Sequence, residues 1–128
     1  MIYLDTSVAL AQLFAEDRAP PESLWTEPLV SSRLLEFELW TRANARGIGT
    51  THAAQIGELT ARVAFLELAR PVLVRALEPF PTPVRTLDAL HLASMDFLRS
   101  QGQRFELATY DAKLAAAARK VGIGVRKI

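Results

Sequence analysis

The chain has 128 residues, the length of one domain, and we expect a single domain over residues 1–128. Half of the residues are hydrophobic and 23% are charged, which excludes extensive disorder and allows a continuous core. The absence of cysteine excludes disulfides and thiolate metal sites. A net charge of +1 indicates no overall attraction to nucleic acid, although 12 of the 15 basic residues are arginine, which suits phosphate contacts.

Charged residues interrupt every apolar stretch well before it reaches the length of a membrane span. The chain also begins without the basic segment and long apolar run of a secretion signal. We therefore expect a soluble, cytoplasmic protein with no membrane partner.

Apolar runs and turn residues predict four strands, over residues 2–4, 29–32, 63–68 and 104–110, and a short final strand over 124–128. Helical spacing predicts helices over residues 8–15, 33–46, 50–62, 86–100 and 112–121, and one that starts near Pro71 and ends before residue 78. Threonines at 50, 51 and 86 are the expected N-caps of two of these helices. Three of the seven prolines fall in residues 16–28, which predicts a loop with at most one helical turn.

Strands that alternate with helices of this length predict right-handed crossovers and a mostly parallel sheet covered on both faces. The expected fold is thus α/β, a three-layer α/β/α sandwich. Ligands of such open sheets bind beyond the carboxyl ends of the strands. Asp5 and Asp111 each follow a predicted strand, so both fall at this end of the sheet.

Two further acids lie in apolar surroundings. Glu38 shares its side of the predicted helix with three leucines, whereas Glu36 points about 160° away around the axis. Asp88 lies in the first turn of a helix whose apolar face is expected to be buried. An isolated carboxylate in such surroundings costs free energy unless something compensates for it.

Convergence of Asp5, Glu38, Asp88 and Asp111 would need protons or a cation, because two carboxylates about 4 Å apart repel by roughly 4 kcal/mol at an effective dielectric of 20. All the candidate ligands are oxygen donors, which favours Mg²⁺ or Mn²⁺ over zinc. Such ions commonly serve phosphate substrates, whose charge they neutralise while they activate water.

Each acid also has a purely structural interpretation. Asp5 and Asp111 are placed as helix N-caps, Asp88 as a partner of the helix dipole, and Glu38 as a partner of Arg42. Four hydroxyls are weaker candidates, which either bond to the acids or satisfy backbone groups at strand ends: Thr6, Ser7, Ser32 and Thr109. Three arginines can contact phosphate, Arg42, Arg46 and Arg85, and His91 lies three residues after Asp88. Trp25, Leu39 and Trp40 belong either to the core or to an interface.

Four segments together resemble the PIN-domain family, and within it the VapC-type toxins of toxin-antitoxin pairs. "YLDTSVAL" is similar to the family's opening strand and D-x-S turn, and "VSSRLLEFELWTRA" to the segment in which a serine precedes the helical acid by six residues. "RTLDALHLASM" and "LATYDAKLAAAARKVGI" resemble the third acidic segment and the closing T-x-D segment. The departure from the family pattern is a second glutamate, Glu36, and helical register favours Glu38 as the matching acid.

The resemblance implies a metal-dependent endoribonuclease with one or two Mg²⁺ or Mn²⁺ ions at Asp5, Glu38, Asp88 and Asp111, supported by Ser7, Ser32 and Thr109. It also implies a homodimer and a cognate antitoxin that covers the active-site groove. One alternative is a PIN-like module that binds RNA or a partner without cleavage and uses a metal for structure. A phosphorylated receiver domain is the other, which we discount because receivers carry adjacent acids after the first strand, whereas Asp5 is followed by Thr6.

Overall fold

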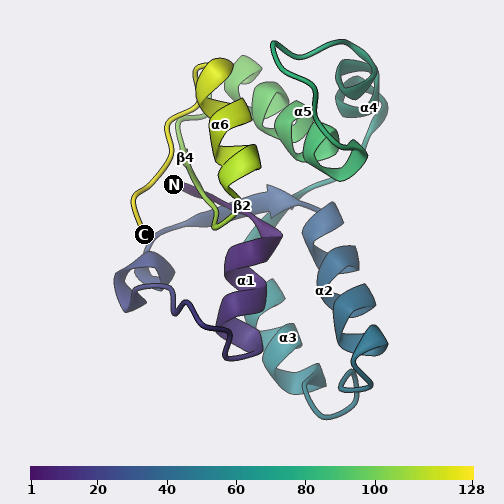
Figure 1. Cartoon of the computed structure of the whole chain (residues 1–128), viewed down its shortest axis with the longest axis vertical. Coiled ribbons are helices and arrows are strands. Elements are labelled where there is room, and N and C mark those ends of the chain that lie inside the picture. The colour runs from purple at the N-terminus through teal and green to yellow at the C-terminus, as the bar shows by residue number, and fades with distance from the viewer.

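The computed structural model describes all 128 residues. Its elements, in chain order, are β1 (Ile2–Leu4), α1 (Thr6–Leu13), the 3₁₀ helix η1 (Glu22–Thr26), β2 (Leu29–Ser32), α2 (Leu34–Ala45), α3 (Ala53–Ala61), β3 (Val63–Leu66), α4 (Arg70–Leu77), α5 (Thr86–Ser100), β4 (Glu106–Ala108) and α6 (Ala112–Lys120) (Figure 1). None of the helices combines the length and the apolar composition that crossing a membrane requires.

The four strands form one parallel sheet in the order β3-β2-β1-β4. Strand β1 lies between β2 and β4, with Ile2 opposite both Leu29 and Glu106. The chain builds outward from β1 to β2 and β3 and then returns to the other side of β1 for β4. The order of the strands therefore reverses at β1, and in open parallel sheets ligands bind beyond the carboxyl ends of the strands at such a point.

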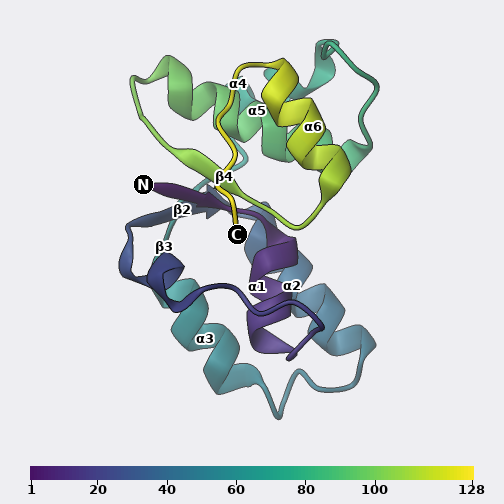
Figure 2. The same ribbon diagram turned by 60° about the vertical axis from the view of Figure 1, so that its left-hand side comes forward.

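Helices cover both faces of the sheet, as Figure 2 shows with α1, α2 and α3 on one side and α4, α5 and α6 on the other. Side chains alternate along β1: Ile2 and Leu4 pack with α1, α2 and α3, while Tyr3 packs with α5 and α6. Each face thus has its own apolar core, and the prediction of a three-layer α/β/α sandwich with a parallel sheet is confirmed.

The ends of several elements differ from expectation for local reasons. Helix α1 begins at Thr6 because Asp5 caps it, and it ends at Leu13, two residues early, because Ala15 adopts a left-handed backbone with φ of 48°. Neither Thr51 nor Thr86 caps its helix: Thr51 donates to the carbonyl of Ile48 and contacts His52, and Thr86 is already helical.

The chain end also differs from expectation, because residues 124–128 form a single bridge, Leu107 to Val125, in place of a strand. Arg126 holds this segment in place through ion pairs with Glu27 and Glu106. The tail therefore covers the outer edge of β4.

Helix α5, which carries Asp88, is tied to α4 by a surface ion-pair network. Asp96 bonds to Arg75 at 2.7 Å and to Arg99 at 3.0 Å. Partial burial works against the charged carboxylate, but the bonds from both arginines outweigh it and lower the pKa of Asp96. The residue thus fixes one helix against another.

Truncation of two leucines, one in the core and one on the surface, should affect the free energy of unfolding very differently. Leu35 is fully buried against the sheet and Leu77 is 86% exposed. We expect Leu35→Ala to lower the free energy of unfolding by about 2–5 kcal/mol through lost contacts and a cavity, and Leu77→Ala to change it by less than about 0.5 kcal/mol. Urea unfolding followed by circular dichroism measures both, and equal losses would contradict the core assignment.

Candidate active site

A cavity of about 710 Å³ opens where the sheet order reverses, beyond the carboxyl ends of the strands. All four predicted acids line it: Asp5, Glu38, Asp88 and Asp111. They come from four segments of the chain, namely the ends of β1 and β4, the middle of α2 and the first turn of α5. Arg42 and Arg85 also line the cavity, so its wall carries both acidic and basic groups.

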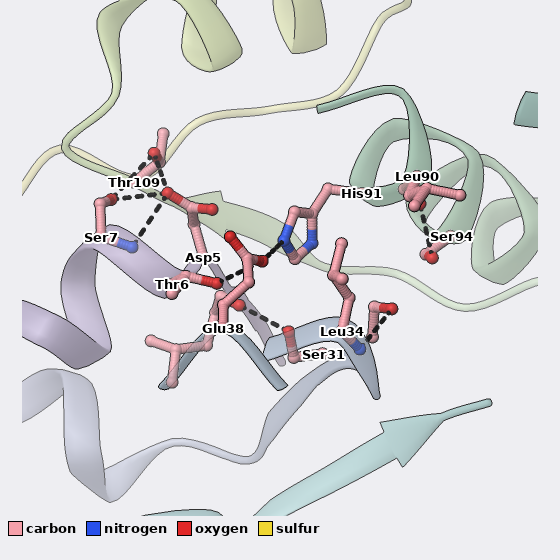
Figure 3. Close-up of polar contacts among 12 residues, drawn as sticks. Asp5, Thr6, Ser7, Ser31, Leu34, Glu38, Leu90, His91, Ser94 and Thr109 are labelled. Atoms are coloured by element: carbon pink, nitrogen blue, oxygen red, sulfur yellow. Dashed lines mark hydrogen bonds and ion pairs between the residues drawn. The ribbon is translucent and has the colours of Figure 1, made fainter. Parts of the chain in front are cut away.

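Asp5 joins the first strand to the last. It is buried directly after β1, and its Oδ2 accepts hydrogen bonds from the Ser7 backbone N–H at 3.3 Å, the Ser7 hydroxyl at 2.6 Å and the Thr109 hydroxyl at 2.7 Å (Figure 3). Ser7 Oγ in turn accepts from the backbone N–H of Tyr110. Three donors hold one oxygen of Asp5, while its Oδ1 has no hydrogen-bond partner in the protein.

The protein likewise holds Glu38 through only one of its two carboxylate oxygens. Its Oε1 accepts from Thr6 Oγ1 at 2.9 Å and lies 2.8 Å from His91 Nε2. Figure 3 shows the carboxylates of Asp5 and Glu38 pointing toward one another, although the residues come from different elements. Oε2 of Glu38 has no hydrogen-bond partner in the protein, so it is free for a ligand in the cavity.

His91 links the cavity to the core. The ring is buried on α5, and its Nδ1 lies 2.8 Å from the hydroxyl of Tyr3 on β1. Burial works against protonation, but the hydrogen bond to Glu38 and the charges of Asp5 and Asp88 outweigh it and raise the pKa of His91. The histidine therefore bonds to a cavity acid on one side and to a core residue on the other.

Asp111 and Asp88 share one cationic neighbour. Asp111 Oδ1 caps α6 by accepting from the backbone N–H groups of Lys113 and Leu114, and its Oδ2 lies 3.4 Å from Arg85 Nη2. Asp88 Oδ2 lies 3.6 Å from Arg85 Nε. Burial and the charge of Asp111 raise the pKa of Asp88, and Arg85 only partly offsets them. A guanidinium thus occupies the position of a cation between the two acids.

The chemistry of this donor set fits a divalent ion. Asp5, Glu38 and Asp88 each keep at least one oxygen without a hydrogen bond from the protein, and the Oδ2 of Asp111 is bonded only to Arg85. Hard cations such as Mg²⁺ and Mn²⁺ favour carboxylate oxygens. The acids do not form a ready-made set, however. As the side chains stand, no three acidic or histidine groups are close enough to hold one ion, so binding requires at least one of the acids to move. The four carboxylates therefore share one cavity without the close mutual contact that was considered from the sequence.

The structure also separates the weaker candidates. Glu36 lies outside the cavity and pairs with Arg33 at 3.2 Å, so only the second glutamate, Glu38, faces the other acids. Ser32 is fully buried and accepts from the backbone N–H of Leu34, without contact to any of the acids. Of the two roles left open for Ser32, it fills the backbone one, whereas Thr6, Ser7 and Thr109 bond to the acids.

Two other candidates lie away from the cavity. Arg46 stacks on the ring of Phe14 and lies 4.0 Å from Glu16, away from the cavity. Leu39 is fully buried, which assigns it to the core and not to an interface.

The bond between His91 and Glu38 is the feature that the sequence alone did not indicate. His91 lies three residues after Asp88 on the same helix, yet it bonds to an acid of a different helix. Recognition of this pair from sequence would require the position of Tyr3 as well, and one tyrosine in a strand carries no such signal.

Comparison with known proteins agrees with the fold. The family model described as "PIN domain" matches residues 2–120 of this chain. A curated relative, Ribonuclease VapC47 of Mycobacterium tuberculosis (strain CDC 1551 / Oshkosh), is 31% identical over 95% of this chain and 93% of its own length.

Two solved structures share the fold. The M. tuberculosis protein VapC20, described as a toxin that cleaves the sarcin-ricin loop, aligns over all of both chains with a TM-score of 0.70 and 20% identity. A chain of a toxin-antitoxin complex from Klebsiella pneumoniae aligns over 94% of both chains with a TM-score of 0.67 and 16% identity. With acids from four segments around one cavity and a family match over nearly its whole length, this chain belongs to the PIN-domain family and is of the VapC type.

Proposed function

We propose that this protein is a metal-dependent endoribonuclease and the toxin of a toxin-antitoxin pair. The observation that carries the proposal is the cavity shared by Asp5, Glu38, Asp88 and Asp111, in which the first three each keep an oxygen free of hydrogen bonds from the protein. The relative named as a ribonuclease and the VapC20 toxin support RNA as the substrate. Hydrolysis at this cavity would leave 5′-phosphate and 3′-hydroxyl ends.

The four acids hold one or two Mg²⁺ or Mn²⁺ ions. Such an ion, when bound, neutralises phosphate charge and makes water a better nucleophile. Asp5 enters the site already oriented by Ser7 and Thr109, and Glu38 by Thr6 and His91. Fixed ligands of this kind keep the free oxygens aimed at the cavity.

The arginines of the cavity wall bind the RNA phosphates. Arg42 lines the cavity on α2 and is exposed, and Arg85 has a side chain 70% accessible to solvent. Guanidinium groups bind phosphate with two parallel hydrogen bonds, which fixes the position of the backbone.

A cognate antitoxin is the protein partner, and the protein is a homodimer. The neighbour solved within a toxin-antitoxin complex supports the first of these. The cavity wall carries two apolar side chains, Phe37 and Leu87, that are 62% and 47% exposed, and a partner chain seated on the cavity would bury both. Coexpression with candidate antitoxins tests the first assembly, and size-exclusion chromatography with light scattering tests the second.

Loss of the free oxygen of Asp5 should abolish cleavage with little effect on the fold. In Asp5→Asn the amide oxygen still accepts from Ser7 and Thr109, but the group facing the cavity no longer binds a cation. We expect at least an approximately 100-fold lower rate, because a catalytic metal supplies several kcal/mol. The assay is cleavage of total cellular RNA with Mg²⁺, Mn²⁺ or EDTA.

The matched control for this variant is Glu36→Gln, which removes the same charge outside the cavity and should change the rate by no more than about twofold. Full activity of Asp5→Asn, or cleavage that persists in EDTA, would refute the assignment. Binding of RNA and metal without any cleavage would identify a non-catalytic module.

The two cavity arginines should respond differently to substitution. We expect Arg42→Ala to weaken RNA binding and lower the salt slope by about 0.7, the value for one phosphate contact on a single strand, with no change in metal affinity. Arg85→Ala should weaken RNA binding as well but raise Mn²⁺ affinity about two- to fivefold, because it removes a cation that pairs with Asp88 and Asp111. Calorimetry measures the Mn²⁺ affinity of each single variant, and RNA binding is measured in the Asp5→Asn background, where no cleavage occurs. Identical Mn²⁺ affinities of Arg85→Ala and the wild type would exclude competition by Arg85.

A further inference from the structure

We propose that Tyr3 and His91 form one buried hydrogen-bond relay that fixes the orientation of the Glu38 carboxylate, which makes both of them positioning residues for this site. The relay consists of two hydrogen bonds of 2.8 Å. Its consequence for catalysis rests on the proposed function.

The relay joins the two helical layers of the molecule at the end of the sheet. It runs from the Tyr3 hydroxyl on β1 to Nδ1 of His91 on α5, and from Nε2 of His91 to Oε1 of Glu38 on α2, with both distances 2.8 Å. Tyr3 is 0% and His91 2% exposed. Helices α2 and α5 pack on opposite faces of the sheet, so the relay sets the position of a cavity acid against the far layer.

Donors and acceptors along the relay allow one arrangement for the neutral ring. The backbone N–H of Ser32 donates to the Tyr3 hydroxyl oxygen at 3.3 Å, and a phenol carries its proton at neutral pH. The acceptor that lies at 2.8 Å from this hydroxyl is Nδ1 of His91. The nearby hydroxyls of Ser31 and Ser94 donate to the carbonyls of Leu4 and Leu90. Nε2 must then carry the ring hydrogen and donate it to Glu38. Protonation of the ring would leave the donation from Nε2 in place.

Two donors from different elements consequently hold the same oxygen of Glu38. Thr6 donates from α1 and His91 from α5, and both bonds go to Oε1. A carboxylate fixed in this way can rotate little, which keeps Oε2 directed into the cavity. Residues of this kind that orient a metal ligand typically affect metal affinity or activity by 10- to 100-fold when they are replaced.

Four variants and a control test the relay. His91→Leu removes both bonds, and His91→Gln keeps a donor for Glu38. Tyr3→Phe removes only the hydroxyl, and the double variant Y3F/H91L tests whether Tyr3 acts through His91. Leu98→Ala, two turns further along α5 and also buried, is the control for loss of stability without loss of the relay.

Two readouts separate positioning from packing. The first is the ¹⁵N spectrum of His91 in metal-free protein, on the alkaline side of its titration, where we expect hydrogen on Nε2 in the wild type and a mixture of tautomers in Y3F. The second is Mn²⁺ affinity by calorimetry, where we expect at least about a tenfold loss in H91L, a smaller loss in Y3F, substantial recovery in H91Q and no change in L98A. Adding Y3F to H91L should cause no further loss.

Hydrogen on Nδ1 in the wild type, or a spectrum that Y3F leaves unchanged, would overturn the relay. Losses of Mn²⁺ affinity that add independently in the double variant, or that L98A reproduces, would overturn it as well. A wild type with the expected tautomer but with neither Mn²⁺ binding nor RNA cleavage would refute the proposed function and support the relay.

Discussion

The site depends on the parallel pairing of β1 and β4, which are the first and last strands along the chain and neighbours in the sheet. The register sets Leu4 opposite Ala108, and the backbone N–H of Asp5 donates to the carbonyl of Ala108 at 3.0 Å. Asp5 and Thr109, 104 positions apart in the chain, therefore meet through a side-chain hydrogen bond of 2.7 Å. Without this register, the start of α1 and the start of α6 would not face the same cavity.

The acids do not contribute to the site in the same way. Asp5 and Asp111 cap helices with one oxygen, Glu38 is held by side chains from two other helices, and Asp88 has only Arg85 beside it. Burial, together with the charge of Asp111, also raises the pKa of Asp88. It is accordingly the member of the set with the least support from the protein and the greatest need of a cation.

Local rules predicted the parts of the site that depend on a single element. The end of a strand places Asp5 and Asp111, and helical register distinguishes Glu38 from Glu36 without knowledge of the fold. The parallel sheet and the three layers follow from the alternation of strands and helices, whereas the order of the strands does not.

Features that depend on two or more elements were not predictable in this way. The contact of His91 with Glu38 requires the crossing of α5 over the end of the sheet and the tyrosine on β1. The missing threonine caps and the single bridge at Val125 likewise reflect tertiary contacts that outweigh local propensity. Helical spacing also cannot say whether a leucine such as Leu39 packs in a core or in an interface.

The helix-capping bonds of Asp5 and Asp111 affect how related sequences should be compared. A cap of this kind contributes about 1 kcal/mol to stability whether or not any chemistry takes place. A related chain that has lost its activity would therefore still favour aspartate at both places, and those two residues are weak markers of a working enzyme. Glu38 and Asp88 cap nothing, so a survey that aims to separate active relatives from inactive ones should give them the greater weight.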